Sequence, residues 1–350
     1  MTKKGSVLIV AIFMAVVLGV MAIGILLRSI SENRLAERNE EFIQAFWLAE
    51  AGVNRAMHEL RSSYSQSGTG LWETSLGVGG YSCDVTVEGS NRRVIARGFI
   101  PATGTARITR VLEVVVSKAI PPNFYENAIY SAGDVNLNGD AYDVTGKIRY
   151  ADQIDNTSNV HGDIVQDASI NPLAKLSFSQ LLTVAEAQSN VYAYNASGKL
   201  VNQATGSQTF PSNFWYSPPS NPADPTTGTP NVVYVLGNLE LRGNIGTIGG
   251  FFVVVGDVIT NPDVTYDATI NGNGTVDGAI YTRGEFRVNG GGGQLNVDGG
   301  VWAGEEARLN GNATVTYNAE YMTAIRNLGI DADVQVVSWN EQQNPYEIIP

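Results

Sequence analysis

The stretch SVLIVAIFMAVVLGVMAIGILL, residues 6–27, contains 22 residues without a single charge. At about 1.5 Å per residue, a helix of this length crosses the roughly 30 Å hydrocarbon core of a bilayer. Lys3 and Lys4 precede it and predict a cytoplasmic amino terminus. A cleaved secretory signal would have a shorter apolar region and a small-residue cleavage site, and Arg28-Ser-Ile-Ser-Glu offers no such site. We therefore expect a single membrane-spanning helix.

The helical pattern continues beyond the span to about residue 62. No proline interrupts it, and charged side chains lie among the remaining positions. Apolar residues recur every three or four positions and so share one face of a helix: Leu35, Phe42, Phe46, Ala49, Val53, Met57 and Leu60. We expect one helix over residues 6–62, with its first half in lipid and its second half packed on a soluble body.

Two strings in this region resemble a known family. Lys3-Lys4-Gly5 followed by Ser6 is similar to the leader of a type IV prepilin, and Ala45-Phe-Trp-Leu-Ala-Glu-Ala-Gly-Val-Asn-Arg-Ala56 resembles the end of the amino-terminal region of PilX-type minor pilins. The resemblance covers about the first 60 residues. It implies that a prepilin peptidase removes residues 1–5 by cutting between Gly5 and Ser6, and that the new amine of Ser6 is methylated. It also implies an inner-membrane precursor that assembles with major and minor pilins into a surface pilus.

One position departs from the pattern of the family. Major pilins usually carry glutamate as the fifth mature residue, where its carboxylate offsets the amino-terminal charge of a neighbouring subunit, and here that residue is Val10. An unpartnered charge in an apolar environment is costly, so a subunit without this carboxylate should insert poorly beneath another subunit. We therefore expect a place at or near the filament tip. The alternative is that Val10 only belongs to a hydrophobic anchor.

The next segment, residues 63–120, predicts a small antiparallel sheet. After a Ser/Gly-rich linker at 62–70, segments at 80–87, 93–99 and 105–117 alternate between apolar and polar residues and are separated by turn residues. This sheet should cover the apolar face of the helix. Cys83 is the only cysteine, which excludes an internal disulfide, and we expect it to pack as a small hydrophobic residue.

Beyond Pro121-Pro122 the sequence repeats a single unit. Each copy has an apolar strand, a glycine corner, an alternating strand and a closing Asn-Gly or Arg-Gly; the copies lie at 127–139, 232–243, 278–290 and 300–311, with a shorter one at 252–260. A spacing near 20 residues predicts the coils of a parallel β-helix over 121–340, with an antiparallel sandwich as the alternative. A helix at 173–188 and a proline-rich loop at 211–230 form an insertion at about 171–230, and 341–350 form a tail. The fold class expected is therefore α+β, mainly β.

Charge and histidine content exclude several functions. Beyond Ser62, 15 basic residues stand against 28 acidic ones, so a nucleic acid is not an expected partner. His58 and His161 are the only histidines, which excludes histidine relays and multi-histidine zinc sites. Two carboxylate pairs, Asp263 with Asp267 and Asp152 with Asp155, do not match a calcium-loop spacing and are typical of turns. We expect no enzymatic activity, no metal and no cofactor.

The aromatic residues Phe214, Trp215 and Tyr216 in the proline-rich loop are a candidate contact with an extracellular surface or a glycan. The alternative is that they pin a long loop to the body. Taken together, the sequence predicts a minor pilin with a large β-rich head that acts in priming or surface adhesion. Two alternatives remain: a membrane-anchored β-helix that binds or cleaves an extracellular polysaccharide, and a type II secretion pseudopilin.

Overall fold

The computed structural model describes residues 4–139, 141–255, 264–289 and 293–342 of the chain. These residues form two compact units. The stalk unit comprises Met1–Ser117 together with Ser338–Pro350, and the head unit comprises Lys118–Val337. The expected fold class is confirmed, because one long helix is followed by a small antiparallel sheet and then by many mostly parallel strands.

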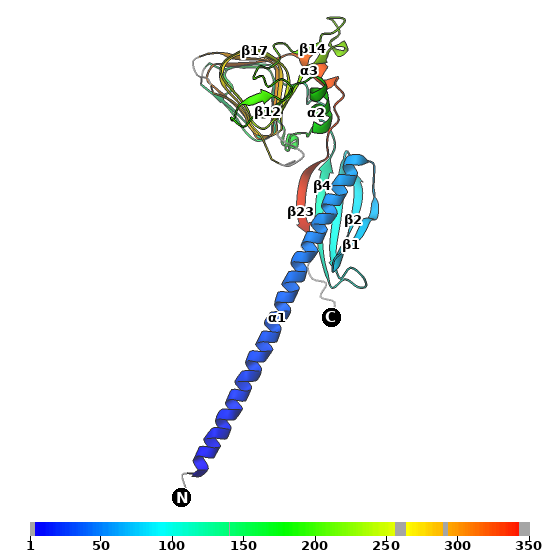
Figure 1. The fold of residues 1–350 in the computed structure, drawn as a ribbon, viewed down its shortest axis with the longest axis vertical. Coiled ribbons are helices and arrows are strands. Elements are labelled where there is room, and N and C mark those ends of the chain that lie inside the picture. The colour runs from blue at the N-terminus through cyan, green and yellow to red at the C-terminus, as the bar shows by residue number, and fades with distance from the viewer. Residues whose placement is uncertain (1–3, 140, 256–263, 290–292, 343–350) are drawn as a thin grey trace. The chain divides into compact units, whose positions relative to one another are not determined.

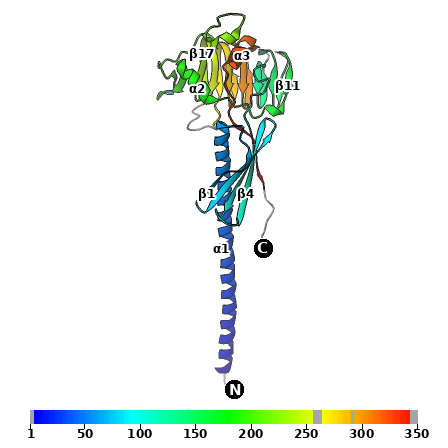
Figure 2. The ribbon, with the colours of Figure 1, turned by 90° about the vertical axis from the view of Figure 1, so that its right-hand side faces the viewer.

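The stalk unit is a long helix, α1 (Lys4–Ser62), that lies across one face of a five-stranded sheet (Figures 1 and 2). The first four strands pair in antiparallel fashion in the order of the chain, and the fifth adds next to β4. The strands are β1 (Gly68–Leu76), β2 (Gly79–Glu88), β3 (Asn91–Ile100), β4 (Ile108–Ser117) and β23 (Gln335–Gln342). Alternate residues of β2 and β3 are buried against the helix, as the period-two pattern predicts.

The sheet has two strands more than the sequence predicts. The Ser/Gly-rich segment assigned as a linker leads into β1, which contains three residues with positive φ, Gly68, Gly70 and Trp72, and register shifts against β2. The other added strand, β23, comes from the carboxyl end of the chain. In the sequence, the residues of the head unit therefore fall between β4 and β23, which are neighbouring strands of one sheet.

The head unit is a coiled stack of parallel strands with three walls. Wall A contains β12 (Val191–Tyr194), β16 (Val232–Leu236), β5 (Ile129–Ser131), β8 (Ile148–Tyr150), β11 (Ile164–Gln166) and the ends of β17 (Leu239–Val254), β18 (Ala268–Thr282) and β20 (Leu295–Ala303). Wall B contains the first parts of β17 and β18 with β19 (Phe286–Asn289), β21 (Glu306–Asn310), β6 (Asp134–Asn138) and β9 (Ile154–Asp155). Wall C contains the middle parts of β17 and β18, the start of β20, and β22 (Ala313–Tyr317), β7 (Asp143–Thr145) and β10 (Val160–His161).

Shorter elements complete the head. Two helices, α2 (Phe178–Ala187) and α3 (Ala319–Arg326), and two short 3-10 turns, η1 (Ala168–Ile170) and η2 (Pro225–Thr227), lie outside the stack. One end of the stack carries β13 (Leu200–Asn202), which pairs antiparallel with β12. A separate two-stranded ribbon consists of β14 (Trp215–Ser217) and β15 (Thr229–Pro230).

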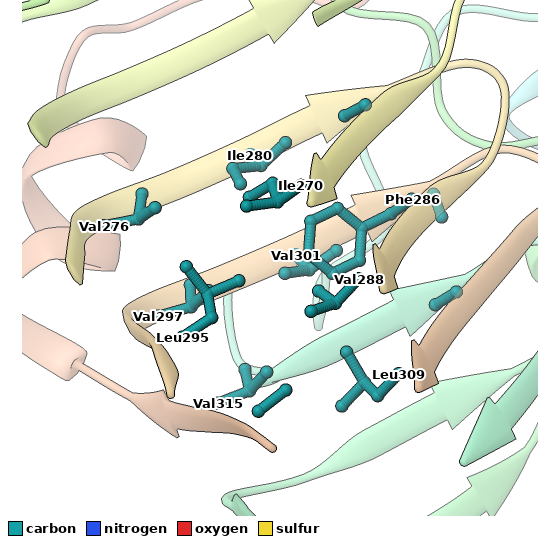
Figure 3. Close-up of a cluster of buried hydrophobic side chains, with 14 of the residues drawn as sticks. Ile270, Val276, Ile280, Phe286, Val288, Leu295, Val297, Val301, Leu309 and Val315 are labelled. Carbon is teal, nitrogen blue, oxygen red and sulfur yellow. The ribbon is translucent and has the colours of Figure 1, made fainter. Parts of the chain in front are cut away.

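The predicted repeat copies stack in register where the structure describes them, and their inward side chains fill the interior; residues 256–260 of the shorter copy and residue 290 lie outside the described residues. One ladder along wall A contains Val233, Phe252, Ile280, Val301, Ile129 and Ile148. Figure 3 shows side chains from all three walls meeting in this core. Because each coil buries its apolar side chains against the next coil, the repeat in the sequence becomes a continuous apolar interior.

The order of the coils in space differs from their order in the chain. The last repeat copy, 300–311, pairs directly with the first copy, 127–139, through Val301 opposite Ile129 and Leu309 opposite Leu137. The chain therefore starts near one end of the stack, completes that end with β8 to β11, and reaches the other end through the segment that contains α2. Figure 2 shows β11 at one end of the head and β17 toward the other.

A second apolar core lies on the outside of wall A. Its largest side chains, Trp302, Tyr130, Tyr281 and Tyr234, are all fully buried. The Trp302 ring stacks on Phe124 at 5.0 Å, and its Nε1 donates a hydrogen bond of 2.7 Å to the Phe124 carbonyl. Residues of α2 and α3 belong to the same core, so these helices cover wall A.

Candidate functional site

The amino-terminal part of α1 carries the predicted processing and membrane functions. Gly5, Ser6 and Val10 lie in the helix, and side chains before Ile12 are outside the described residues, so the roles given to these three residues stay predictions. From Ile12 onward α1 is long and apolar enough to cross a membrane. The side chains of Phe13 and Leu26 are 69% and 63% exposed. Length and composition alone support the span.

The Ala-Glu-Ala-Gly string has a packing role that the structure makes explicit. Ala45, Ala49 and Ala56 are fully buried where α1 meets β2 and β3. A Cβ atom on Gly52 would lie 3.1 Å from the Cys83 Sγ, and one on Gly98 would lie 2.0 Å from the Ala45 carbonyl oxygen. Small residues are therefore required on both surfaces, because the helix backbone and the sheet approach so closely.

Cys83 sits at this contact. It is fully buried, and its thiol donates a 3.2 Å hydrogen bond to the Gly52 carbonyl oxygen. Burial, and then the charge of Asp84, raises the pKa of the thiol to about 12. Since the thiolate is the reactive form, this cysteine is a packing residue, as the sequence predicts.

A different side of the same helix leaves apolar side chains uncovered within the stalk unit. Ile43 and Trp47 are 59% and 61% exposed. Near them in sequence, the Glu50 Oε2 atom is buried and has no hydrogen-bond partner among the described residues. Isolated apolar side chains on a surface are common, but these two lie four positions apart and so share one side of the helix.

The aromatic trio of the proline-rich loop does not act as one surface. Phe214 is buried and stacks on Tyr321 of α3 with ring centroids 4.1 Å apart. Trp215 is half-buried with its ring against Phe214, whereas Tyr216 is 55% exposed. The prediction of a joint surface contact is therefore wrong for Phe214, which pins the loop to the head. Only Tyr216 presents most of its side chain to solvent.

The two carboxylate pairs singled out in the sequence do not form a metal site in the described residues, where no group of three or more histidine, cysteine, aspartate or glutamate side chains could hold an ion. Asp152 and Asp155 are exposed. The Asp267 Oδ1 accepts a 2.8 Å hydrogen bond from the backbone N–H of Glu285. This carboxylate therefore links the corners of two coils. Asp263 lies outside the described residues.

Sequence reasoning missed another pair of carboxylates, on wall C. Asp277 of β18 and Asp298 of β20 lie opposite each other in register. Burial, and then the neighbouring Asp298, raises the pKa of Asp277, while Asn318 donates a 2.9 Å hydrogen bond to Asp298. Burial followed by these two carboxylates raises the pKa of Tyr321 to about 12. The signal was the tripeptide Val-Asp-Gly, which occurs at 276–278 and 297–299.

Comparisons with known proteins add little to this geometry. No protein-family model matches the chain, and no curated protein matches it. Among solved structures, an ice binding protein from an Antarctic bacterium, Flavobacteriaceae, is 14% identical, with a TM-score of 0.20. The similarity covers 56% of this chain and 48% of that chain, so the chain spans about half the length of the protein it matches. No functional conclusion rests on a similarity of this size.

Proposed function

We propose that this chain is a minor pilin of the PilX type whose head acts in priming or surface adhesion. One observation carries the proposal: a single helix, α1, continues from an apolar, membrane-length half into a half that packs on a small antiparallel sheet. In such a subunit the apolar half anchors the precursor in the inner membrane and later joins the filament, while the second half fixes the helix to the body. Leader cleavage between Gly5 and Ser6, methylation of Ser6 and assembly with other pilins follow from the proposal.

The uncovered side of α1 offers a surface for the helix of another pilin, which supports the proposal. Ile43 and Trp47 stay exposed although Ala45, Ala49 and Gly52 on the opposite side are closely packed. Covering large apolar side chains with another helix would remove their surface from water, which favours association by about 25 cal/mol for each Å² buried. One side of the helix therefore contacts its own sheet, and the opposite side contacts neighbouring pilins.

The proposed place is at or near the tip of the filament. Val10 provides no carboxylate for the amino-terminal charge of another copy, so stacking identical subunits leaves that charge without a partner. A head of 220 residues, Lys118–Val337, on every subunit would also crowd a helical array. Both arguments favour few copies, and a ratio to the major pilin that approaches one in sheared filaments would contradict this place.

Intact mass of the membrane-extracted protein tests the processing step. In cells with an active prepilin peptidase, the wild-type mass should correspond to a chain that begins at methylated Ser6. Gly5→Val should leave the five-residue leader in place, because the peptidase requires the glycine at the cut. The matched control is Gly19→Val, a position in the span where an added Cβ has no neighbour within 4 Å, and this variant should be processed normally. A wild-type chain that keeps residues 1–5 would contradict the proposal.

A further inference from the structure

Wall B displays the same outward pattern in four coils. An acidic residue opens each copy, a polar residue follows two positions later, and Asn-Gly closes it, at 267–272, 285–290, 306–311 and 134–139. Because these strands stack in register, the asparagines fall into one row across the strands. We call this the amide row: Asn271, Asn289, Asn310 and Asn138.

The amides of the row are linked to one another. The Asn138 Nδ2 donates to the Asn310 Oδ1 at 2.9 Å, Asn310 donates to Asn289 at 3.2 Å, and Asn289 donates to Asn271 at 2.9 Å. An asparagine amide has two N–H donors and a carbonyl oxygen with two lone pairs. At Asn289 and Asn310 the ladder uses one donor and one lone pair, and it leaves one of each. The row therefore leaves at least one donor and one acceptor on each strand, at intervals of about 4.8 Å.

The arginines beside the row are each paired with a glutamate of their own strand. Arg287 pairs with Glu285, Arg308 pairs with Glu306 at 2.8 Å, and Arg242 pairs with Glu240 at 2.9 Å. The head as a whole carries 10 basic and 22 acidic residues over 118–337. An anionic polymer would therefore meet neutralised guanidinium groups and a repulsive field. The field therefore disfavours an anionic ligand, and the row itself consists of neutral amides that suit a neutral ligand.

Wall B is also open, as far as the described residues show. No described helix makes extensive contact with β19, β21 or β6, whereas α2 and α3 pack on strands of wall A. Asn138 and Arg242 are exposed, and the other three asparagines are half-buried between neighbouring strands. A ligand could approach the amide row along its length without displacing a described element.

We propose that wall B binds a neutral, linear polysaccharide that runs across the strands along the amide row. A hydroxyl group is both a donor and an acceptor, as is each amide of the row, and a sugar polymer repeats its hydroxyl groups at regular intervals. The proposal specifies the partner of the head in an adhesive pilin, and it rests on the proposed function only for the extracellular location. Its test needs neither leader cleavage nor filament assembly, so the two proposals fail independently.

The test is a binding isotherm with the full-length protein, purified in a detergent without a sugar headgroup. The neutral probes are amorphous cellulose, insoluble chitin and cross-linked dextran, and the anionic probe is immobilised polygalacturonate. We expect saturable binding to at least one neutral probe and weaker binding to polygalacturonate. The double variant Asn289→Ala and Asn310→Ala should weaken binding about tenfold, because two amides that hydrogen-bond the ligand are lost.

Two further variants keep the result interpretable. Asn138→Leu removes the exposed end of the row with little risk to folding, and it should weaken binding by a smaller factor, about threefold. Asn296→Ala with Thr314→Ala changes two outward positions of wall C and should leave binding unchanged. The proposal is overturned by lack of binding to all three neutral probes, by tighter binding to polygalacturonate, or by equal losses from the wall B and wall C variants.

Discussion

The stalk unit and the head unit bury their apolar side chains in different ways. In the stalk, one helix and one sheet meet at a few small residues, so a single backbone contact such as Gly98 against Ala45 sets the distance. In the head, the interior is a ladder of similar side chains repeated coil after coil. Charge divides in the same way, because the head carries 10 basic and 22 acidic residues while the rest of the chain carries 12 of each. The packing of the stalk therefore depends on close approach at single positions, whereas the packing of the head depends on a repeat of similar side chains.

The largest effect should come from one methyl group in the stalk. In Gly98→Ala, the new Cβ would lie 2.0 Å from the Ala45 carbonyl oxygen and 2.4 Å from the Ala49 nitrogen, so the helix must leave the sheet. We expect a loss of at least ~3 kcal/mol, and a thermal transition of the stalk roughly 12 °C lower or more. Hydrogen exchange measured by mass spectrometry should show lost protection in β2 to β4 and unchanged protection in the head.

Thr86→Ala, an exposed position on β2, is the matched control and should change the stalk by less than about 0.5 kcal/mol. If Gly98→Ala behaved like this control, the close approach of helix and sheet would not be the determinant of stalk stability.

The melting temperature of the head should fall less, although a larger group is deleted. Trp302→Ala removes a fully buried indole that stacks on Phe124, which costs about 3–5 kcal/mol, or about 10 °C for a unit of this size. Trp302→Phe keeps a smaller aromatic ring but loses the hydrogen bond to the Phe124 carbonyl, and it should cost about 1–3 kcal/mol. The measurement is the same exchange experiment, with lost protection expected in the head and not in β2 to β4. Equal losses in both units would show that they unfold as one.

Much of each unit could be predicted from local sequence. The helix, the three central strands of the stalk and the repeat copies follow from periods of 3.6 and 2 and from glycine spacing, and these elements are where the sequence places them. The amide row was also within reach, because aligned copies put Asn289 and Asn310 at the same repeat position. What the alignment could not give was the hydrogen bonding between them.

The remaining features depend on contacts between distant parts of the chain. The pairing of β23 with β4 joins segments more than 200 residues apart, and no local pattern identifies that partner. The coils over 143–166 consist of strands of two or three residues, too short for a period to appear. Likewise, the burial of Phe214 follows from α3, whose Tyr321 meets it only in the folded head.

The smallest expected effects are changes in melting temperature at neutral pH, and their signs are opposite in the two units. In the head, burial and the neighbouring Asp298 raise the pKa of Asp277 above its ordinary value of 3.8. In the stalk, burial alone would raise the pKa of Asp84, but the backbone N–H of Gly70 and the Arg97 guanidinium outweigh it and lower the pKa. A raised carboxyl pKa means that the folded state holds its proton more tightly than the unfolded state does. Ionised Asp277 therefore lowers the stability of the head once the pH is above the ordinary pKa of 3.8. Ionised Asp84 contributes stability there, and that contribution is lost as the pH falls through its lowered pKa.

Asp277→Asn should therefore raise the melting temperature of the head at neutral pH by at most a few degrees, since the side chain is only partly buried. The gain should disappear below pH 3.8, where the wild-type carboxyl is protonated in both states. Asp84→Asn should instead lower the melting temperature of the stalk at neutral pH, and that loss should also fade in acid because the Arg97 pair is then absent in both proteins. Thermal unfolding of both variants across this pH range, followed by exchange in each unit, provides the measurement. Shifts of the same sign in the two units would mean that Asp298 does not repel Asp277 in the folded head, and that charge does not distinguish the units in the way their compositions indicate.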